Sequence, residues 1–140
     1  MAYSKEEKTK IIDDIFNQLI EGKSLRKTVI KSGISCKVFF QWIKQDKDKS
    51  NQYALASGIR ADVLFEEILD IADDGSGDYQ NTPEGLKLIP ENIQRSRVRI
   101  DARKFYLSKV MPKKYGEKID ITSDGDKISQ PPVTFKIINK

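Results

Sequence analysis

Three polar side chains, Lys37, Gln41 and Lys44, recur at spacings of four and three residues in the segment CKVFFQWIKQD. On a helix, this spacing places all three on one outward stripe. A lysine ammonium group can bind phosphate or guanine, and a glutamine amide can make paired hydrogen bonds to adenine. The segment is therefore a candidate for contacting nucleic acid.

The region around this stripe is strongly basic. From residue 22 to residue 49 there are eight basic and two acidic residues, a net charge of +6. Clustered positive charge favours a polyanionic partner. The charge of this region therefore supports the stripe of Lys37, Gln41 and Lys44 as a candidate contact with nucleic acid.

The elements that must position these residues are short helices. Apolar residues recur at three- and four-residue spacing from Glu6 to Ile20, which predicts a helix with one broad apolar face that ends before Gly22. This helix would supply most of the apolar surface on which the basic region folds.

Two further short helices are expected after it. Ser24 stands where it can cap a helix over 25–31, and Ser35 where it can cap a helix over 36–46. Gly33 lies in the turn between them and can adopt the left-handed conformation that other residues avoid. A short helix, a glycine-containing turn and a second helix form a helix-turn-helix pattern, in which the second helix enters the DNA major groove.

This pattern alone leaves alternatives open. Small three-helix domains that bind protein also contain glycine turns and exposed lysines. Phe39 and Trp42 fit the apolar core of such a unit better than they fit stacking on bases.

Two longer amphipathic segments of opposite charge follow. Residues 54–94 contain nine acidic and two basic residues, a net of −7, whereas residues 95–118 contain nine basic and two acidic residues, a net of +7. Helical apolar spacing predicts helices over 54–74 and 93–111, and the second should end there because Pro112 disfavours helical geometry in the preceding residue. We expect an antiparallel hairpin, with charge matching inside the hairpin as the simplest account of the charges.

Two helices alone make a thin core, so surplus apolar surface is expected to pack on other copies of the chain. The glycines, prolines and polar residues of 75–92 predict a loop between the helices. The expected oligomerisation residues lie on both helices: Ile59, Val63, Phe65, Ile68, Leu69, Val98, Ala102, Phe105 and Leu107.

The C-terminal segment changes character. Residues 118–122 and 133–138 are rich in β-branched side chains at alternating positions, which predicts two short strands. Isolated strands are marginal in water, so we expect neighbouring subunits to share them; a disordered tail is the alternative. The expected fold is mainly α, with domains at 1–52 (helix-turn-helix), 53–116 (helical oligomerisation) and 117–140 (β-element or tail).

Composition argues against catalysis. The chain has no histidine and one cysteine, Cys36, so a histidine-containing zinc site or a Ser/His or Cys/His catalytic unit cannot be assembled. It also has no GxxxxGK[ST] phosphate loop, and we expect no cofactor and no bound metal. No apolar run is long enough to cross a membrane and the N-terminus is too polar for a signal peptide, which predicts a cytosolic protein.

Two stretches carry a family resemblance: RADVLFEEILDIADD (60–74) and RVRIDARKFYLSKVMPKKYGEK (97–118). They resemble the small terminase subunits of tailed bacteriophages, in the group where a helix-turn-helix precedes an oligomerising helical hairpin and a C-terminal β-element. That family shows an arginine–aspartate pair, a Phe-Glu-Glu-Ile core, and a closing Pro-basic-Lys-Tyr-Gly-acidic-Lys motif. The helix-turn-helix match is looser, because similar strings occur in transposases and repressors. Phe105 stands where family members often carry tryptophan.

The resemblance implies a non-catalytic ring of about eight or more copies. Such a ring would bind the packaging initiation site on double-stranded viral DNA and deliver the DNA to the large terminase subunit, which supplies ATPase and nuclease. The resemblance also implies which residues would contact DNA: Lys27, Lys31, Ser35, Lys37, Gln41 and Lys44. The C-terminal strands, together with the rim of the ring, would contact the large subunit. The protein would act in the host bacterial cytoplasm and be absent from the mature virion. Two other functions stay open on sequence alone: a dimeric helix-turn-helix regulator or transposase DNA-binding subunit, and a structural ring whose N-terminal domain binds protein.

Overall fold

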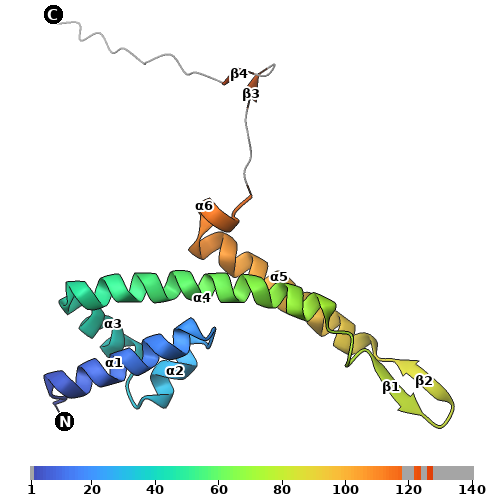
Figure 1. The fold of residues 1–140 in the computed structure, drawn as a ribbon, viewed down its shortest axis with the longest axis horizontal. Coiled ribbons are helices and arrows are strands. Elements are labelled where there is room, and N and C mark those ends of the chain that lie inside the picture. Colours follow the sequence, from blue (N-terminus) through green and yellow to red (C-terminus); the bar gives the residue numbers. More distant parts are fainter. Residues whose placement is uncertain (1, 118–121, 124–125, 128–140) are drawn as a thin grey trace, which may run out of the picture.

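The computed structural model describes residues 2–117, 122–123 and 126–127. Its N-terminal part is a small helical domain made of α1 (Lys5–Ile20), α2 (Leu25–Lys31) and α3 (Cys36–Gln45), which lies along the first half of the long helix α4 (Lys47–Asp73) (Figure 1). The three helices predicted from sequence are confirmed to within a residue at each end.

Two of the first three helices, α1 and α3, begin with a side-chain cap that the local sequence provides. Ser4 and Glu7 form a reciprocal capping box at the start of α1. The predicted cap of α3 is confirmed, because the backbone N–H of Val38 donates to Ser35 Oγ at 3.2 Å. The predicted side-chain cap at Ser24 is wrong: Ser24 stands at the N-cap position, but only its backbone carbonyl is used, by the N–H of Thr28 at 3.0 Å.

The core of this domain is built on Phe39, which is fully buried. Its ring meets those of Phe16 and Tyr53 edge to face, at centroid distances of 6.5 and 5.8 Å. Trp42 packs half-buried at the margin, edge-on to Tyr3 at 5.3 Å. Phe39 and Trp42 are therefore part of the core, as the sequence predicted.

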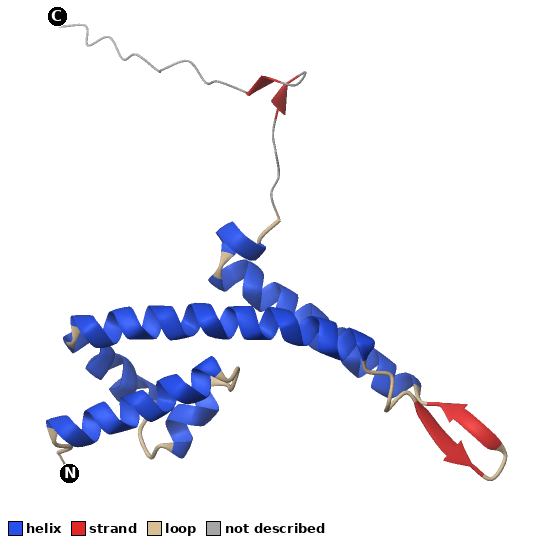
Figure 2. Ribbon diagram, viewed as in Figure 1, coloured by secondary structure: helices blue, strands red, loops and turns tan. Residues whose placement is uncertain are grey.

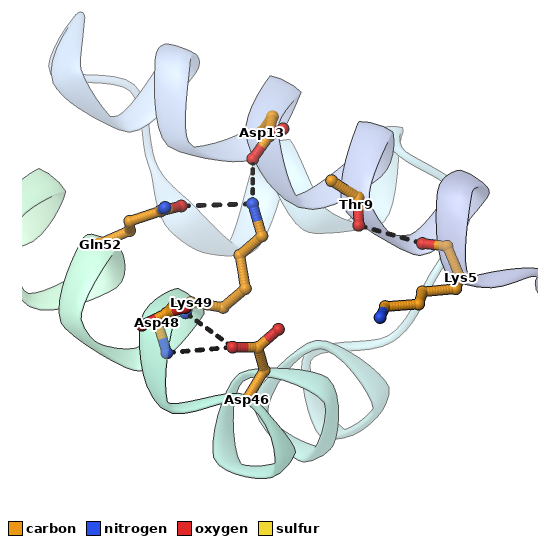
Figure 3. Close-up of polar contacts among 7 residues, drawn as sticks. All are labelled: Lys5, Thr9, Asp13, Asp46, Asp48, Lys49 and Gln52. Atoms are coloured by element: carbon orange, nitrogen blue, oxygen red, sulfur yellow. Dashed lines mark hydrogen bonds and ion pairs between the residues drawn. The ribbon is translucent and has the colours of Figure 1, made fainter.

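The helix α4 is longer than expected. It begins at Lys47, directly after Asp46, whose carboxylate accepts from the backbone N–H groups of Asp48 and Lys49 at 3.0 and 3.2 Å (Figure 3). Lys49 also forms an ion pair with Asp13 of α1 at 2.5 Å. The helix-turn-helix domain and the hairpin therefore share one unbroken helix, which passes through the expected boundary at 52/53.

The predicted antiparallel helical hairpin is confirmed. Helix α5 (Pro90–Val110) returns along α4, and the buried side chains of Ala61, Leu64 and Leu107 form its core. It ends before Pro112, as expected, and Pro112–Tyr115 forms the short helix α6. Each helix in the described residues is too short or too polar to traverse a lipid bilayer.

The predicted loop over 75–92 is wrong in its centre. Strands β1 (Tyr79–Thr82) and β2 (Gly85–Leu88) pair antiparallel, with Tyr79 opposite Leu88, and project beyond the end of the helical hairpin (Figure 2). Only Pro83 and Glu84 separate them, and Gly85 adopts φ 117°. Short strands with few apolar residues gave no periodic signal, so the pairing was missed.

The C-terminal expectation is only partly within the described residues. Strands β3 (Thr122–Ser123) and β4 (Asp126–Lys127) pair antiparallel. The strand predicted over 118–122 shares Thr122 with β3, and the strand predicted over 133–138 lies outside the described residues. The sharing of strands between subunits stays a prediction.

Candidate nucleic-acid interface

The six residues predicted to contact DNA are all exposed. The inward positions of α3 are occupied by Phe39 and Ile43, which are buried, so the positions of its polar stripe face solvent. The turn before α3 depends on Gly33, whose φ is 81° as the sequence predicted. The stripe comprises Lys37, Gln41 and Lys44 on α3; Lys27 and Lys31 lie on α2, and Ser35 precedes α3.

Ser35 has a structural function in the fold. Its Oγ accepts from the Val38 N–H and so begins α3, which fixes where the stripe starts. A helix N-terminus also presents unpaired backbone N–H groups that favour an anion.

The basic residues of this region divide into two groups. Within the described part of the chain, Lys23 pairs with Glu21 and Lys49 with Asp13. Lys27, Lys31, Lys37 and Lys44 are in no ion pair there. The sequence count therefore included two lysines whose charge is matched inside the molecule. Of the six bases of 22–49 without an ion pair among the described residues, five lie on α2 and α3, and the sixth, Lys47, begins α4.

Arg60 attaches this unit to the rest of the protein, and sequence reasoning missed it. Its Nε donates to the backbone carbonyl of Lys23 at 3.0 Å, and its Nη1 donates to the hydroxyl of Tyr106 on α5 at 2.6 Å. The turn after α1 also lies against α4, because a Cβ placed on Gly22 would lie 3.0 Å from Val63 Cγ1. The sequence contained one indication that Arg60 matters: with Asp62 it forms the arginine–aspartate pair that the family also shows.

The second member of that pair, Asp62, anchors α6. Its carboxylate accepts from Lys114 Nζ at 2.7 Å and from the hydroxyl of Tyr115, whose ring stacks on Phe65 at 4.9 Å. The hydrogen bond from Lys114, with that from Tyr115, holds the pKa of Asp62 below its ordinary value. The hydrogen bond to Asp62 raises the pKa of Lys114 and that of Tyr115.

The predicted oligomerisation residues lie in two different environments. Leu107 is 1% exposed in the hairpin core, and Ile59, Val63 and Ile68 are half-buried. The others are exposed: Phe65, Leu69, Val98, Ala102 and Phe105. The sequence predicted one apolar side for α5, but the helix is apolar on two sides, one facing α4 and the other facing solvent.

No group of three or more potential metal ligands occurs among the described residues. A groove of about 560 Å³ between α4, α5 and α6 is lined in part by Phe65, Ile68, Phe105 and Tyr115, and also by Lys104 and Lys109. Its apolar walls suit packing against protein.

Comparison with known proteins identifies the family. Residues 7–122 match the family described as bacteriophage Sf6, terminase small subunit-like. The chain belongs to this family of terminase small subunits.

Solved structures agree. Three crystal structures of single-substitution variants of the terminase small subunit gp1 of the bacterial virus Sf6 are similar to this chain, with 30%, 31% and 31% sequence identity. Each has a TM-score of 0.64, and the similarity covers 96% of this chain and 96% of gp1. No curated protein matched.

Proposed function

We propose that the protein is the DNA-recognition subunit of a phage packaging terminase. It binds double-stranded viral DNA at the packaging initiation site through α2 and α3. It assembles as a ring of about eight or more copies and delivers the DNA to the large terminase subunit, without catalysing a reaction itself. The observation that carries the proposal is a set of four lysines on a helix-turn-helix unit, in a chain of this family. These lysines lie around Gln41 and have no ion-pair partner among the residues that the structure describes.

Assembly of several copies should raise the affinity for DNA, because each helix-turn-helix unit alone makes only weak contacts. One helix-turn-helix unit with a few lysines binds DNA weakly, whereas several units on one scaffold gain from the effective concentration of their neighbours. The unbroken α4 and the Arg60 contacts support this proposal, because they hold each unit in a defined orientation on the hairpin.

The decisive experiment measures DNA binding of the variant Lys37→Ala/Lys44→Ala by fluorescence anisotropy over a range of salt concentrations. The probes are tiled duplex fragments of the genome that encodes the chain. Loss of two phosphate contacts per unit should weaken binding by at least ~10-fold and reduce the salt slope by about 1.8. The matched control is Lys5→Ala/Lys10→Ala, which removes two exposed lysines of α1.

Equal affinity of the two variants would show that α3 does not contact DNA.

Native mass spectrometry of the wild-type chain across salt concentrations tests the ring. A closed assembly of about eight or more copies agrees with the proposal, and a monomer or dimer contradicts it.

Delivery to the large subunit is tested with a chain truncated after Glu117. We expect this chain to retain DNA binding and to lose co-sedimentation with the purified large subunit. Retained co-sedimentation would assign that contact to another surface.

A further inference from the structure

An exposed aromatic ring lies within the basic face of α3. Phe40 is 44% exposed, whereas its neighbour Phe39 is fully buried. Positions i, i+3, i+4 and i+7 share one face of a helix, and in α3 they are occupied by Lys37, Phe40, Gln41 and Lys44. This face therefore combines two bases, one amide and one apolar ring.

The ring of Phe40 is held by two aromatic neighbours. Its centroid lies 5.3 Å from that of Phe39 and 5.8 Å from that of Tyr53 on α4, and both pairs meet edge to face. The part of the ring that these contacts do not cover is open to solvent. A side chain that is already fixed loses little conformational freedom when it binds a partner, so Phe40 is suited to recognition.

Exposure alone would not indicate a function for Phe40, because single apolar side chains are common on protein surfaces. Its position on α3 is what distinguishes it. Lys37 precedes it by three residues and Lys44 follows it by four, so both lysines are its direct neighbours on the helix surface. Neither lysine is in an ion pair within the described ranges. The ring therefore lies between two positive charges that are free to bind phosphate.

The DNA major groove offers a contact for each kind of side chain on this face. In an A·T base pair, the N6 and N7 atoms of adenine lie in the same groove as the C5-methyl group of thymine. A glutamine amide can bind the adenine edge, and an apolar side chain can contact the methyl group. A ring beside Gln41 is thus placed to meet thymine.

We propose that Phe40 contacts thymine methyl groups in the major groove, beside the adenine that Gln41 binds. This inference rests on the proposed function and adds to it a residue that determines which DNA is bound. The lysines would neutralise phosphates, which gives affinity that depends on salt and carries no sequence information. Phe40 has no charge, so its contribution depends on the sequence of the DNA and not on salt.

Deoxyuridine substitution tests the contact from the side of the DNA. Uracil lacks the C5-methyl group of thymine and keeps its hydrogen-bonding groups. The probe is the tiled genome fragment that the full chain binds most tightly, prepared once with thymidine and once with deoxyuridine in its place. Fluorescence anisotropy should show binding that is about 4-fold weaker for each methyl group lost from contact.

Protein variants test whether Phe40 makes this contact. Phe40→Ala should bind the two duplexes with equal affinity and keep the wild-type salt slope, because no phosphate contact is removed. Measuring both proteins on both duplexes also cancels any effect of deoxyuridine on the shape of the DNA. If circular dichroism shows that Phe40→Ala is not folded, Phe40→Gln replaces it, because it keeps a long side chain without an apolar end. The same equal affinity is expected.

The matched control is Tyr3→Ala, which removes another partly exposed ring of the same domain. Tyr3 is 39% exposed and packs edge-on to Trp42. Trp42 follows Phe40 by two residues, so the two side chains point to nearly opposite sides of α3. Tyr3→Ala should therefore keep the wild-type preference for the thymidine duplex.

Three outcomes would overturn the proposal. The first is equal affinity of the wild-type chain for the two duplexes, and the second is an unchanged preference in a folded Phe40 variant. The third is a smaller native mass of the Phe40 variant than of the wild type, which would place the ring between copies of the chain.

A failure of the proposed function gives a different result. If Lys37→Ala/Lys44→Ala weakens binding while the wild-type chain binds both duplexes alike, α3 contacts DNA and the methyl contact alone is removed. If the wild-type chain binds neither duplex, the proposed function and this inference are both wrong.

Discussion

Arg60 donates a hydrogen bond from Nη1 to the hydroxyl of Tyr106 at 2.6 Å, and its guanidinium carbon lies 5.0 Å from the centre of the same ring. The same side chain reaches the backbone carbonyl of Lys23 through Nε. One arginine on α4 therefore joins the turn after α1 to α5. These contacts fix the orientation of the helix-turn-helix unit on the hairpin.

Replacing Arg60 with lysine tests this connection. A lysine keeps the charge but cannot reproduce the planar donor geometry toward two acceptors. We expect Arg60→Lys to lower the free energy of unfolding by about 1–3 kcal/mol, measured by urea titration. Arg97→Lys, at an exposed position on α5, is the matched control and should change stability by less than about 0.5 kcal/mol. Equal effects of the two variants would contradict the role given to Arg60.

Leu107 should be essential to the hairpin itself. Because it is fully buried against Ala61 and Leu64, Leu107→Ala removes buried apolar surface and leaves a cavity. The expected loss is about 2–5 kcal/mol in urea unfolding. Leu86→Ala makes the same chemical change on the β1–β2 arm, where the side chain is 73% exposed, and should cost less than about 0.5 kcal/mol. A small effect at Leu107 would place the hairpin core elsewhere.

The contact between α6 and α4 should weaken in acid. The pKa of Asp62 is lowered in the folded chain, first by its hydrogen bond from Lys114, so its carboxylate stabilises the fold above its ordinary pKa of 3.8. That stabilisation is lost as the pH falls through the folded pKa. Asp62→Asn should therefore flatten the dependence of the urea midpoint on pH below about pH 4. The control Asp101→Asn, at an exposed position of α5, should keep the wild-type dependence.

The same contact should weaken in alkali. The hydrogen bond to Asp62 raises the pKa of Tyr115, so the neutral phenol stabilises the fold below its ordinary pKa of 10.0 and that contribution is lost as the pH rises through the folded pKa. Tyr115→Phe should remove this alkaline loss of stability. The absorbance of the phenolate, at about 300 nm, follows the titration of tyrosine. Ionisation of Tyr115 together with the exposed tyrosines would contradict the contact.

Glycine positions should respond in opposite directions. Gly33 adopts φ 81° in the helix-turn-helix turn, so Gly33→Ala should destabilise by about 1–2 kcal/mol although nothing lies within 4 Å of the added carbon. Gly58 lies within α4 with open space around it, so Gly58→Ala should stabilise by about 0.5–1 kcal/mol. Thermal or urea unfolding of both variants measures the difference, and the same sign for both would contradict the backbone argument.

Gln41 should affect which DNA is bound more than how strongly salt weakens binding. A glutamine amide reads adenine but neutralises no phosphate, so Gln41→Ala should reduce the preference between tiled genome fragments while keeping the wild-type salt slope. Lys37→Ala should instead reduce the slope by about 0.9 and weaken all fragments alike. An unchanged preference in Gln41→Ala would remove it from base contact.

Patterns within a few residues of one another determined much of this protein. Apolar periodicity predicted α1 to α3 and the antiparallel pair α4 and α5, Gly33 and Ser35 predicted the turn, and Pro112 predicted the end of α5. These features follow from backbone geometry and local hydrogen bonds, which depend on neighbours along the chain. Residue motifs were also enough to recognise the terminase small subunit family.

Tertiary contacts decided the rest. Leu107 and Phe105 are both apolar, and only the packing of α4 decides that Leu107 faces inward while Phe105 faces solvent. Arg60 and Asp62 acquire their functions from Tyr106 and Lys114, which are distant in sequence. The pairing of β1 with β2 likewise depends on backbone hydrogen bonds that side-chain periodicity does not encode. Which face of a helix is buried depends on a partner segment that local sequence does not specify.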